Sequence, residues 1–169
     1  MSLFMPDYFF RRIWDISSDD IKTIGAKLLI LDVDNTLAKH NEAIPHKQAK
    51  KWVELVQATS TKLVILSNNH DGRVEKFAKK LGLSHVGNAR KPLGIGFRRV
   101  MREFGALKPE MAIIGDQIYT DVLGGNLFGI TTVLVLPIEP EHTRFFRFKR
   151  AMEKPFLKAS EKNKANLNS

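Results

Sequence analysis

Apolar runs that suit buried strands alternate along this chain with segments whose apolar residues recur at helical spacing. The runs cover residues 27–34, 62–68, 85–88, 111–115 and 130–136, and the helical segments cover about 46–60, 72–81, 93–104 and 120–128. Strands joined one after another by single helices run parallel in one sheet, with helices on its faces. The alternation therefore predicts a three-layer α/β fold with a five-stranded, mainly parallel sheet.

Length and composition suit a single domain. The 169 residues are 43% hydrophobic and 27% charged, which is enough apolar material for a core. We expect one domain over residues 1–158 and a disordered polar tail over residues 159–169. The chain contains no cysteine, so disulfides and cysteine-ligated zinc are excluded.

The first residues of the chain carry charges, among them Asp7, Arg11, Arg12 and Asp15, and do not suit a secretory signal. No apolar run has the length of a membrane span. We therefore expect a cytoplasmic protein, with peripheral attachment to the inner face of the membrane left open.

The chain is basic, with a formal net charge of +9. This charge favours contact with polyanions, such as phosphorylated substrates, anionic lipid or nucleic acid. From about residue 139 to 158 the sequence interleaves aromatic residues with cations, as in Phe145, Arg147 and Phe148. This basic amphipathic pattern suits a helix on an anionic membrane and equally a helix packed on its own domain, so membrane, RNA and own-domain contacts all stay open.

Polar side chains gather where the apolar runs end. In chain order they are Asp32, Asp34, Ser67, Asn68, Asn69, Lys91 and Asp116. In parallel-sheet folds, ligands bind beyond the carboxyl ends of the strands. Two carboxylates as close as Asp32 and Asp34 repel each other, and Mg²⁺, which prefers carboxylate oxygens, removes that cost. One aspartate can then attack an electrophile while the other transfers protons. Aspartates that merely cap the following turn are the alternative.

These positions resemble the four motifs of the haloacid dehalogenase (HAD) superfamily, most of whose members are Mg²⁺-dependent phosphatases. The matching residues are Asp32-Val33-Asp34-Asn35-Thr36, Ser67, Lys91-Pro92, and Gly115-Asp116 with Asp121. Extended by Ser67-Asn68-Asn69 and by residues 115–117 and 120–126, the pattern is similar to the YqeG family, a group of HAD subfamily IIIA whose relatives include phosphatidylglycerophosphate phosphatases. The similarity runs from about Leu3 to Glu153. It implies a Rossmann-like HAD fold and phosphatase activity.

The resemblance also implies catalytic roles for the acidic residues. Asp32 would be the nucleophile and become an aspartyl-phosphate, and Asp34 would protonate the leaving group and then activate water. Asp32, Asp116 and the backbone carbonyl of Asp34 would hold Mg²⁺. Asp121 would stand behind them and orient a metal-bound water or Lys91.

The remaining motif residues would contact the substrate. Ser67 would donate to a phosphoryl oxygen, and Lys91 would offset charge on the transferring group. Asn68 and Thr36 join them as substrate-binding candidates. Each has a plainer alternative: Ser67 as a turn residue, Lys91 as a surface lysine, and Thr36 as a support of the loop after the nucleophile.

The spacing leaves no room for a large cap domain. Only a loop and one helix fit between Asp34 and Lys62, and only one helix fits between Pro92 and Met111. An open site suits a bulky substrate, or coverage by a second subunit in a homo-oligomer. Together with the family resemblance and the basic C-terminal segment, the open site makes phosphatidylglycerophosphate the leading substrate, with a soluble phosphoester as the second choice. A phospho-receiver switch and a basic RNA- or ribosome-associated protein are the alternatives from other functional classes.

Overall fold

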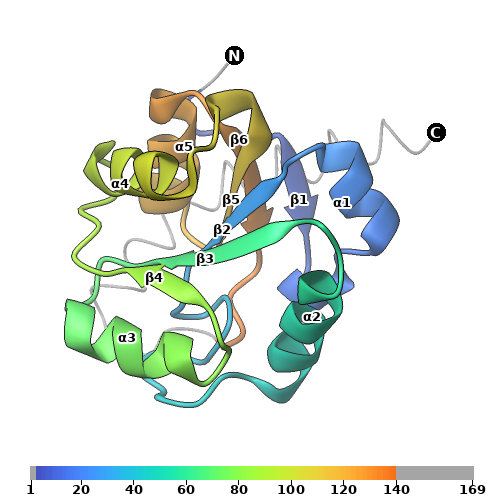
Figure 1. The fold of residues 1–169 in the computed structure, drawn as a ribbon, viewed down its shortest axis with the longest axis vertical. Coiled ribbons are helices and arrows are strands. Elements are labelled where there is room, and N and C mark those ends of the chain that lie inside the picture. Colours follow the sequence, from blue (N-terminus) through green and yellow to red (C-terminus); the bar gives the residue numbers. More distant parts are fainter. Residues whose placement is uncertain (1–2, 140–169) are drawn as a thin grey trace.

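The structure is a computed structural model that describes residues 3–139 (Figure 1). Its sheet has the order β1-β6-β5-β2-β3-β4, and every neighbouring pair is parallel. The strands are β1 (Tyr8–Phe10), β2 (Leu28–Leu31), β3 (Lys62–Leu66), β4 (Ser84–Val86), β5 (Met111–Gly115) and β6 (Thr131–Val135). The helices are α1 (Ser18–Ile24), α2 (Lys47–Gln57), α3 (Asp71–Lys79), α4 (Ile95–Phe104) and α5 (Leu123–Phe128). The predicted α/β class and parallel sheet are confirmed.

The prediction of five strands is wrong, because β1 adds a sixth strand at the edge of the sheet. Tyr8 and Phe10 pair with Val133 and Val135 of β6, and Phe9 between them is buried. A strand of three aromatic residues is too short to show an alternating pattern, so its sequence does not distinguish it from a packed loop. The aromatic N-terminal segment thus belongs to the core.

The helices cover both faces of the sheet, which gives the predicted three layers. On one face, Leu29, Leu31 and Ile65 pack with side chains of α1, α2 and α3, among them Trp52 and Phe77. On the other face, Ile30 and Leu66 pack with Phe97 and Val100 of α4 and with Phe128 of α5. Because both faces are covered, the central strands are buried along almost their whole length.

The connections between strands are short where a cap domain would be inserted. A loop and α2 join β2 to β3, while α4 and a short turn at Lys108–Glu110 join β4 to β5. Over residues 3–139 there is accordingly no large cap domain, as predicted. None of the helices in this part of the chain is long and apolar enough to cross a membrane. The basic segment from residue 140 onward and the tail at 159–169 lie outside the described residues.

The order of the strands fixes where a site can form. The chain passes from β2 outward through β3 to β4, and then returns to β5 on the other side of β2. The crevice beyond the carboxyl ends of β2 and β5 is therefore the point where the strand order reverses, which is where ligands bind in open parallel sheets. Asp32 follows β2 and Asp116 follows β5 at this crevice.

Candidate functional site

The backbone after β2 fixes the two aspartates of the first motif in different places. The N–H of Asp32 donates to the carbonyl of Ile114 at 3.0 Å, so Asp32 extends the contact between β2 and β5. The carbonyl of Val33 then accepts from the N–H groups of residues 36, 37 and 38, at 3.2, 2.9 and 3.2 Å. This tight turn separates Asp34 from the strand, so the carboxylates of Asp32 and Asp34 contact different residues.

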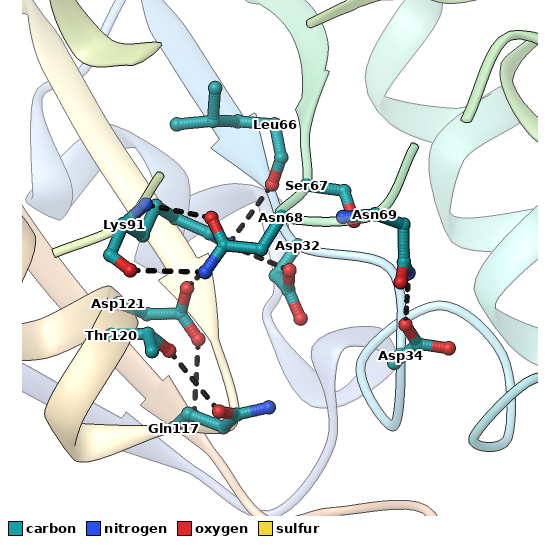
Figure 2. A network of polar contacts seen from close by, with 10 residues as sticks. All are labelled: Asp32, Asp34, Leu66, Ser67, Asn68, Asn69, Lys91, Gln117, Thr120 and Asp121. Carbon is teal, nitrogen blue, oxygen red and sulfur yellow. Dashed lines mark hydrogen bonds and ion pairs between the residues drawn. The ribbon is translucent and has the colours of Figure 1, made fainter. Parts of the chain in front are cut away.

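Lys91 is the centre of the polar network drawn in Figure 2. Its Nζ donates to Oδ1 of Asp32 and to Oδ1 of Asp121, each at 2.7 Å, and to the carbonyl of Leu66 at 3.0 Å. The Lys91 side chain is only 2% exposed. A buried ammonium requires compensation by charge and hydrogen bonds, and these three acceptors supply it. Lys91 is therefore part of the site and not a surface lysine.

Asn68 holds the backbone of Lys91 in place. Its Oδ1 accepts from the Lys91 N–H at 2.7 Å, and its Nδ2 donates to the Lys91 carbonyl at 3.0 Å. Both ends of the amide are thus engaged with protein. In this arrangement Asn68 positions Lys91, while direct contact with a substrate stays a prediction.

The electrostatics of the buried pair favour a charged lysine beside an acid that is hard to ionise. Burial raises the pKa of Asp32 to about 7, although the nearby Lys91 charge acts in the opposite direction. Burial lowers the pKa of Lys91, but the carboxylates of Asp121 and Asp32 outweigh burial and raise it above its usual range. Lys91 consequently keeps its charge at neutral pH, and Asp32 needs additional positive charge to ionise fully.

Three buried carboxylates form a group that suits a divalent cation. Asp32, Asp116 and Asp121 each offer an oxygen, and these oxygens lie within 4.8 Å of one another. Hard oxygen donors are what Mg²⁺ prefers, and one lysine alone does not balance three acids. Gly115 makes this closeness possible, because a Cβ atom at that position would lie 2.3 Å from Cγ of Asp121. The residues present therefore fit the predicted metal. Asp121, predicted to stand behind the ligands, lies near enough to bind the ion itself.

The carboxylate of Asp34 lies apart from this group. Figure 2 shows it on the side of the site away from Lys91, facing Asn69. Its Oδ2 accepts from Nδ2 of Asn69, while Oδ1 accepts from Nη2 of Arg73 at 2.9 Å and from the N–H of Asn41 at 3.0 Å. This position agrees with a proton-transfer role for the side chain, while metal binding by the backbone carbonyl of Asp34 stays a prediction.

Two hydroxyl groups complete the predicted set. Ser67 is buried at the end of β3, and its Oγ accepts from the N–H of Asn69 at 3.2 Å, which leaves its own proton free to donate. Thr36 is also buried, and within the described part of the chain its hydroxyl oxygen makes no hydrogen bond. A buried hydroxyl of this kind is costly unless a ligand or water satisfies it. Ser67 and Thr36 thus stay candidates for substrate contact.

A cavity of about 180 Å³ opens above the network. Asp32, Asp34, Ser67, Asn68 and Lys91 line it, as do four residues without a predicted role: His40, Asn69, Gln117 and Thr120. Asn69, Gln117 and Thr120 lie inside the segments that resemble the YqeG family, so the motifs alone could have identified them as site residues.

Arg73, which holds the Asp34 carboxylate, could not be found in this way. The helical spacing predicts a solvent-facing side chain for it.

Comparisons with known proteins identify the family of this chain. Residues 88–137, which include Lys91, Asp116 and Asp121, match the HAD-hydrolase-like family model. The chain is 36% identical over 156 residues to the probable phosphatase YqeG of Bacillus subtilis, an alignment that covers 92% of this chain and 91% of that protein. The similarity thus extends over nearly the full length of both proteins.

More distant relatives share the fold or part of the sequence. Phosphatidylglycerophosphate phosphatase 1 of Arabidopsis thaliana is 25% identical over 86% of this chain, which spans only 43% of that longer protein. The cobalt-bound deoxy-D-mannose-octulosonate 8-phosphate phosphatase of Haemophilus influenzae superposes with a TM-score of 0.54 at 17% identity, covering 83% of this chain and 92% of that one. This second likeness shows the fold alone. Together with the match to YqeG, these findings show that the chain belongs to the YqeG family of HAD-like phosphatases.

Proposed function

We propose that this phosphatase hydrolyses phosphate monoesters with Mg²⁺, through an aspartyl-phosphate on Asp32. The observation that carries the proposal is the Lys91 ammonium, which bridges Asp32 and Asp121 at 2.7 Å beneath a cavity lined by Ser67 and Asp34. Asp32, Asp116 and the backbone carbonyl of Asp34 would hold the ion, with Asp121 beside them. When bound, Mg²⁺ would offset the negative charge of these carboxylates and of the phosphoryl oxygens.

The residues divide the reaction into two displacements. In the first, a carboxylate oxygen of Asp32 bonds to phosphorus, the bond from phosphorus to the ester oxygen breaks, and Asp34 gives its proton to the departing alkoxide. In the second, Asp34 takes a proton from water as the water oxygen attacks phosphorus, and inorganic phosphate leaves as the bond to Asp32 breaks. Lys91 and Ser67 would stabilise the phosphoryl oxygens in both steps.

The physiological substrate that we propose is phosphatidylglycerophosphate. Two points support it: the sequence similarity to a plant phosphatase of that specificity, and a site without a large cap over residues 3–139. The cavity of about 180 Å³ is smaller than the roughly 300–1,000 Å³ of pockets that enclose drug-sized ligands, so most of a lipid substrate would lie outside it. A soluble phosphoester is the alternative.

Phosphate release by the purified full chain tests the chemistry. Asp32→Asn removes the nucleophile and keeps the shape of the side chain, so turnover should fall by at least about a thousandfold without loss of the fold. The exposed Asp15→Asn variant is the matched control and should retain wild-type rates. Activity should disappear with a chelator and return with Mg²⁺. A wild-type rate for Asp32→Asn would overturn the mechanism.

A second comparison tests the substrate. The rate on phosphatidylglycerophosphate in mixed micelles is compared with rates on sugar phosphates, nucleotides and phosphopeptides. A clear preference for the lipid supports the assignment. A preference for a soluble ester removes the lipid and leaves the proposed chemistry intact.

A further inference from the structure

A larger groove adjoins the catalytic cavity on the side of Asp34. Its volume is about 770 Å³, and it runs between α3 and the loop at residues 42–43. Ala43 is exposed in its wall, and the buried side chains of Val33 and Phe77 lie beneath it. Asn69 lines both the groove and the catalytic cavity, so the two spaces meet at that residue.

The polar rim of the groove is positive. Four cations of α3 and its C-terminal end line it, against the single acid Glu42: Arg73, Lys76, Lys79 and Lys80. Three of the four are engaged by the protein. Arg73 binds Asp34, Lys79 pairs with Glu75 at 2.8 Å, and Lys80 donates to the carbonyl of Ala43 at 2.6 Å.

Lys76 is the cation that the fold leaves available to a ligand. It is exposed, and it makes no ion pair or hydrogen bond within residues 3–139. It lies three residues after Arg73 on α3, so the two cations occupy the same helix face. The groove thus combines apolar surface with an available positive charge, which is complementary to an amphiphilic anion.

The position of Asp34 determines which part of a substrate enters the groove. If Asp34 protonates the departing alkoxide, the leaving group must extend from phosphorus toward Asp34 and not toward Lys91. The two side chains that hold the Asp34 carboxylate, Asn69 and Arg73, also line the groove. A leaving group on this side therefore passes from the catalytic cavity directly into the groove.

We propose that the groove binds the leaving group of the substrate, and that this group is an amphiphile with a second negative charge beyond the reacting phosphate. Lys76 determines specificity by contacting the second charge, while the apolar part lies against the exposed Ala43, above the buried Val33 and Phe77. The inference rests on the proposed phosphatase function and assigns the part of the protein that recognises the leaving group.

Three substrates separate the contribution of the second charge from that of the acyl chains. 4-Nitrophenyl phosphate carries no second charge, glycerophosphoglycerol phosphate carries the second charge without acyl chains, and dihexanoyl phosphatidylglycerophosphate carries both. For each, kcat/KM is measured at one fixed salt concentration for the wild type and for Lys76→Glu, and selectivity is expressed relative to 4-nitrophenyl phosphate. Lys51→Glu is the matched control, because Lys51 is an exposed lysine of α2 outside the groove.

We expect Lys76→Glu to lower the selectivity for both doubly charged substrates about tenfold, mainly through KM. We also expect the wild type to prefer the acylated substrate severalfold over the deacylated one. Unchanged selectivity in Lys76→Glu, or an equal fall in Lys51→Glu, would overturn the proposal. Equal rates on the acylated and deacylated substrates would overturn its apolar part. Failure of the wild type on every phosphate ester would instead overturn the proposed function.

Discussion

Nη2 of Arg73 lies 2.9 Å from Oδ1 of Asp34, so a residue in the first turns of α3 fixes the aspartate proposed to transfer protons. The same guanidinium donates through Nη1 to Oδ1 of Asn41 at 3.1 Å. It thereby connects three segments: the turn after β2, the following loop and α3. The orientation of Asp34 is therefore a property of the fold and does not depend on its own turn alone.

Arg73→Ala should impair proton transfer more than phosphoryl binding. Without the guanidinium, Asp34 loses a charged hydrogen-bond partner and samples more orientations, so kcat should fall about tenfold on an alkyl ester such as glycerol 3-phosphate. The fall should be smaller for 4-nitrophenyl phosphate, because its leaving group departs without a proton. Steady-state kinetics on both esters test this.

The control for Arg73 is Arg102→Ala, since Arg102 is an exposed arginine in the last turn of α4. Its rates on both esters should equal those of the wild type. An equal loss on the alkyl and aryl esters in Arg73→Ala would show that Arg73 acts on something other than the orientation of the acid.

Lys91→Met should destabilise the protein as well as inactivate it. The substitution leaves Asp32 and Asp121 buried without their shared cation, and breaking a buried ion pair on one side costs about 3–5 kcal/mol of unfolding free energy. Urea unfolding in a chelating buffer at pH 8 measures this loss. Added Mg²⁺ should recover part of it, because the ion replaces the missing charge.

Lys62→Met serves as the control for this measurement, because Lys62 is exposed at the start of β3. Its unfolding free energy should stay within about 0.5 kcal/mol of the wild type. A Lys91→Met variant as stable as this control would contradict the buried ion-pair network.

The site was predictable from sequence to the extent that its residues follow buried strands. β5 is found where it was expected, at Met111–Gly115, because a strand covered on both faces is a continuous apolar run. Asp32, Ser67 and Asp116 follow such runs directly, and the parallel topology then brings them together. To predict that these three residues lie at the same edge of the sheet, the order of the motifs along the chain was sufficient.

Other features depend on information that apolar patterns do not carry. Arg73 belongs to a helix whose spacing predicts a solvent-facing side chain. Its contact with Asp34 joins residues that lie 39 positions apart in the sequence. That contact exists because β2 and β3 are neighbours in the sheet. By contrast, α1 had a local signal: Ser17 and Asp20 form a capping box at its start. The short β1 had neither kind of signal.

Gly115→Ala should displace Asp121. The added methyl group would lie 2.3 Å from both Cγ and Oδ2 of Asp121, a distance at which the carboxylate must move from its position beside Lys91. We expect a loss of about 1–3 kcal/mol in unfolding free energy from overpacking, and at least about a tenfold fall in kcat/KM. Gly72→Ala is the stability control, because its added methyl would meet its nearest neighbour at an ordinary 3.6 Å. Wild-type stability and activity in Gly115→Ala would contradict the close packing of the site.

Asp32 should make the stability of the chelator-treated protein depend on pH. Burial raises the pKa of Asp32 from 3.8 to about 7, so between these values the folded protein keeps a proton that the unfolded chain has lost. This contribution to stability is full below about pH 4 and disappears as the pH rises through 7. Relative to Asp32→Asn, the wild-type unfolding midpoint should therefore fall by several degrees between pH 5 and pH 8. At pH 8, Mg²⁺ should raise the unfolding midpoint of the wild type more than that of Asp32→Asn. Thermal unfolding followed by circular dichroism tests both statements, and parallel pH curves for the two proteins would show that Asp32 ionises without cost in the folded state.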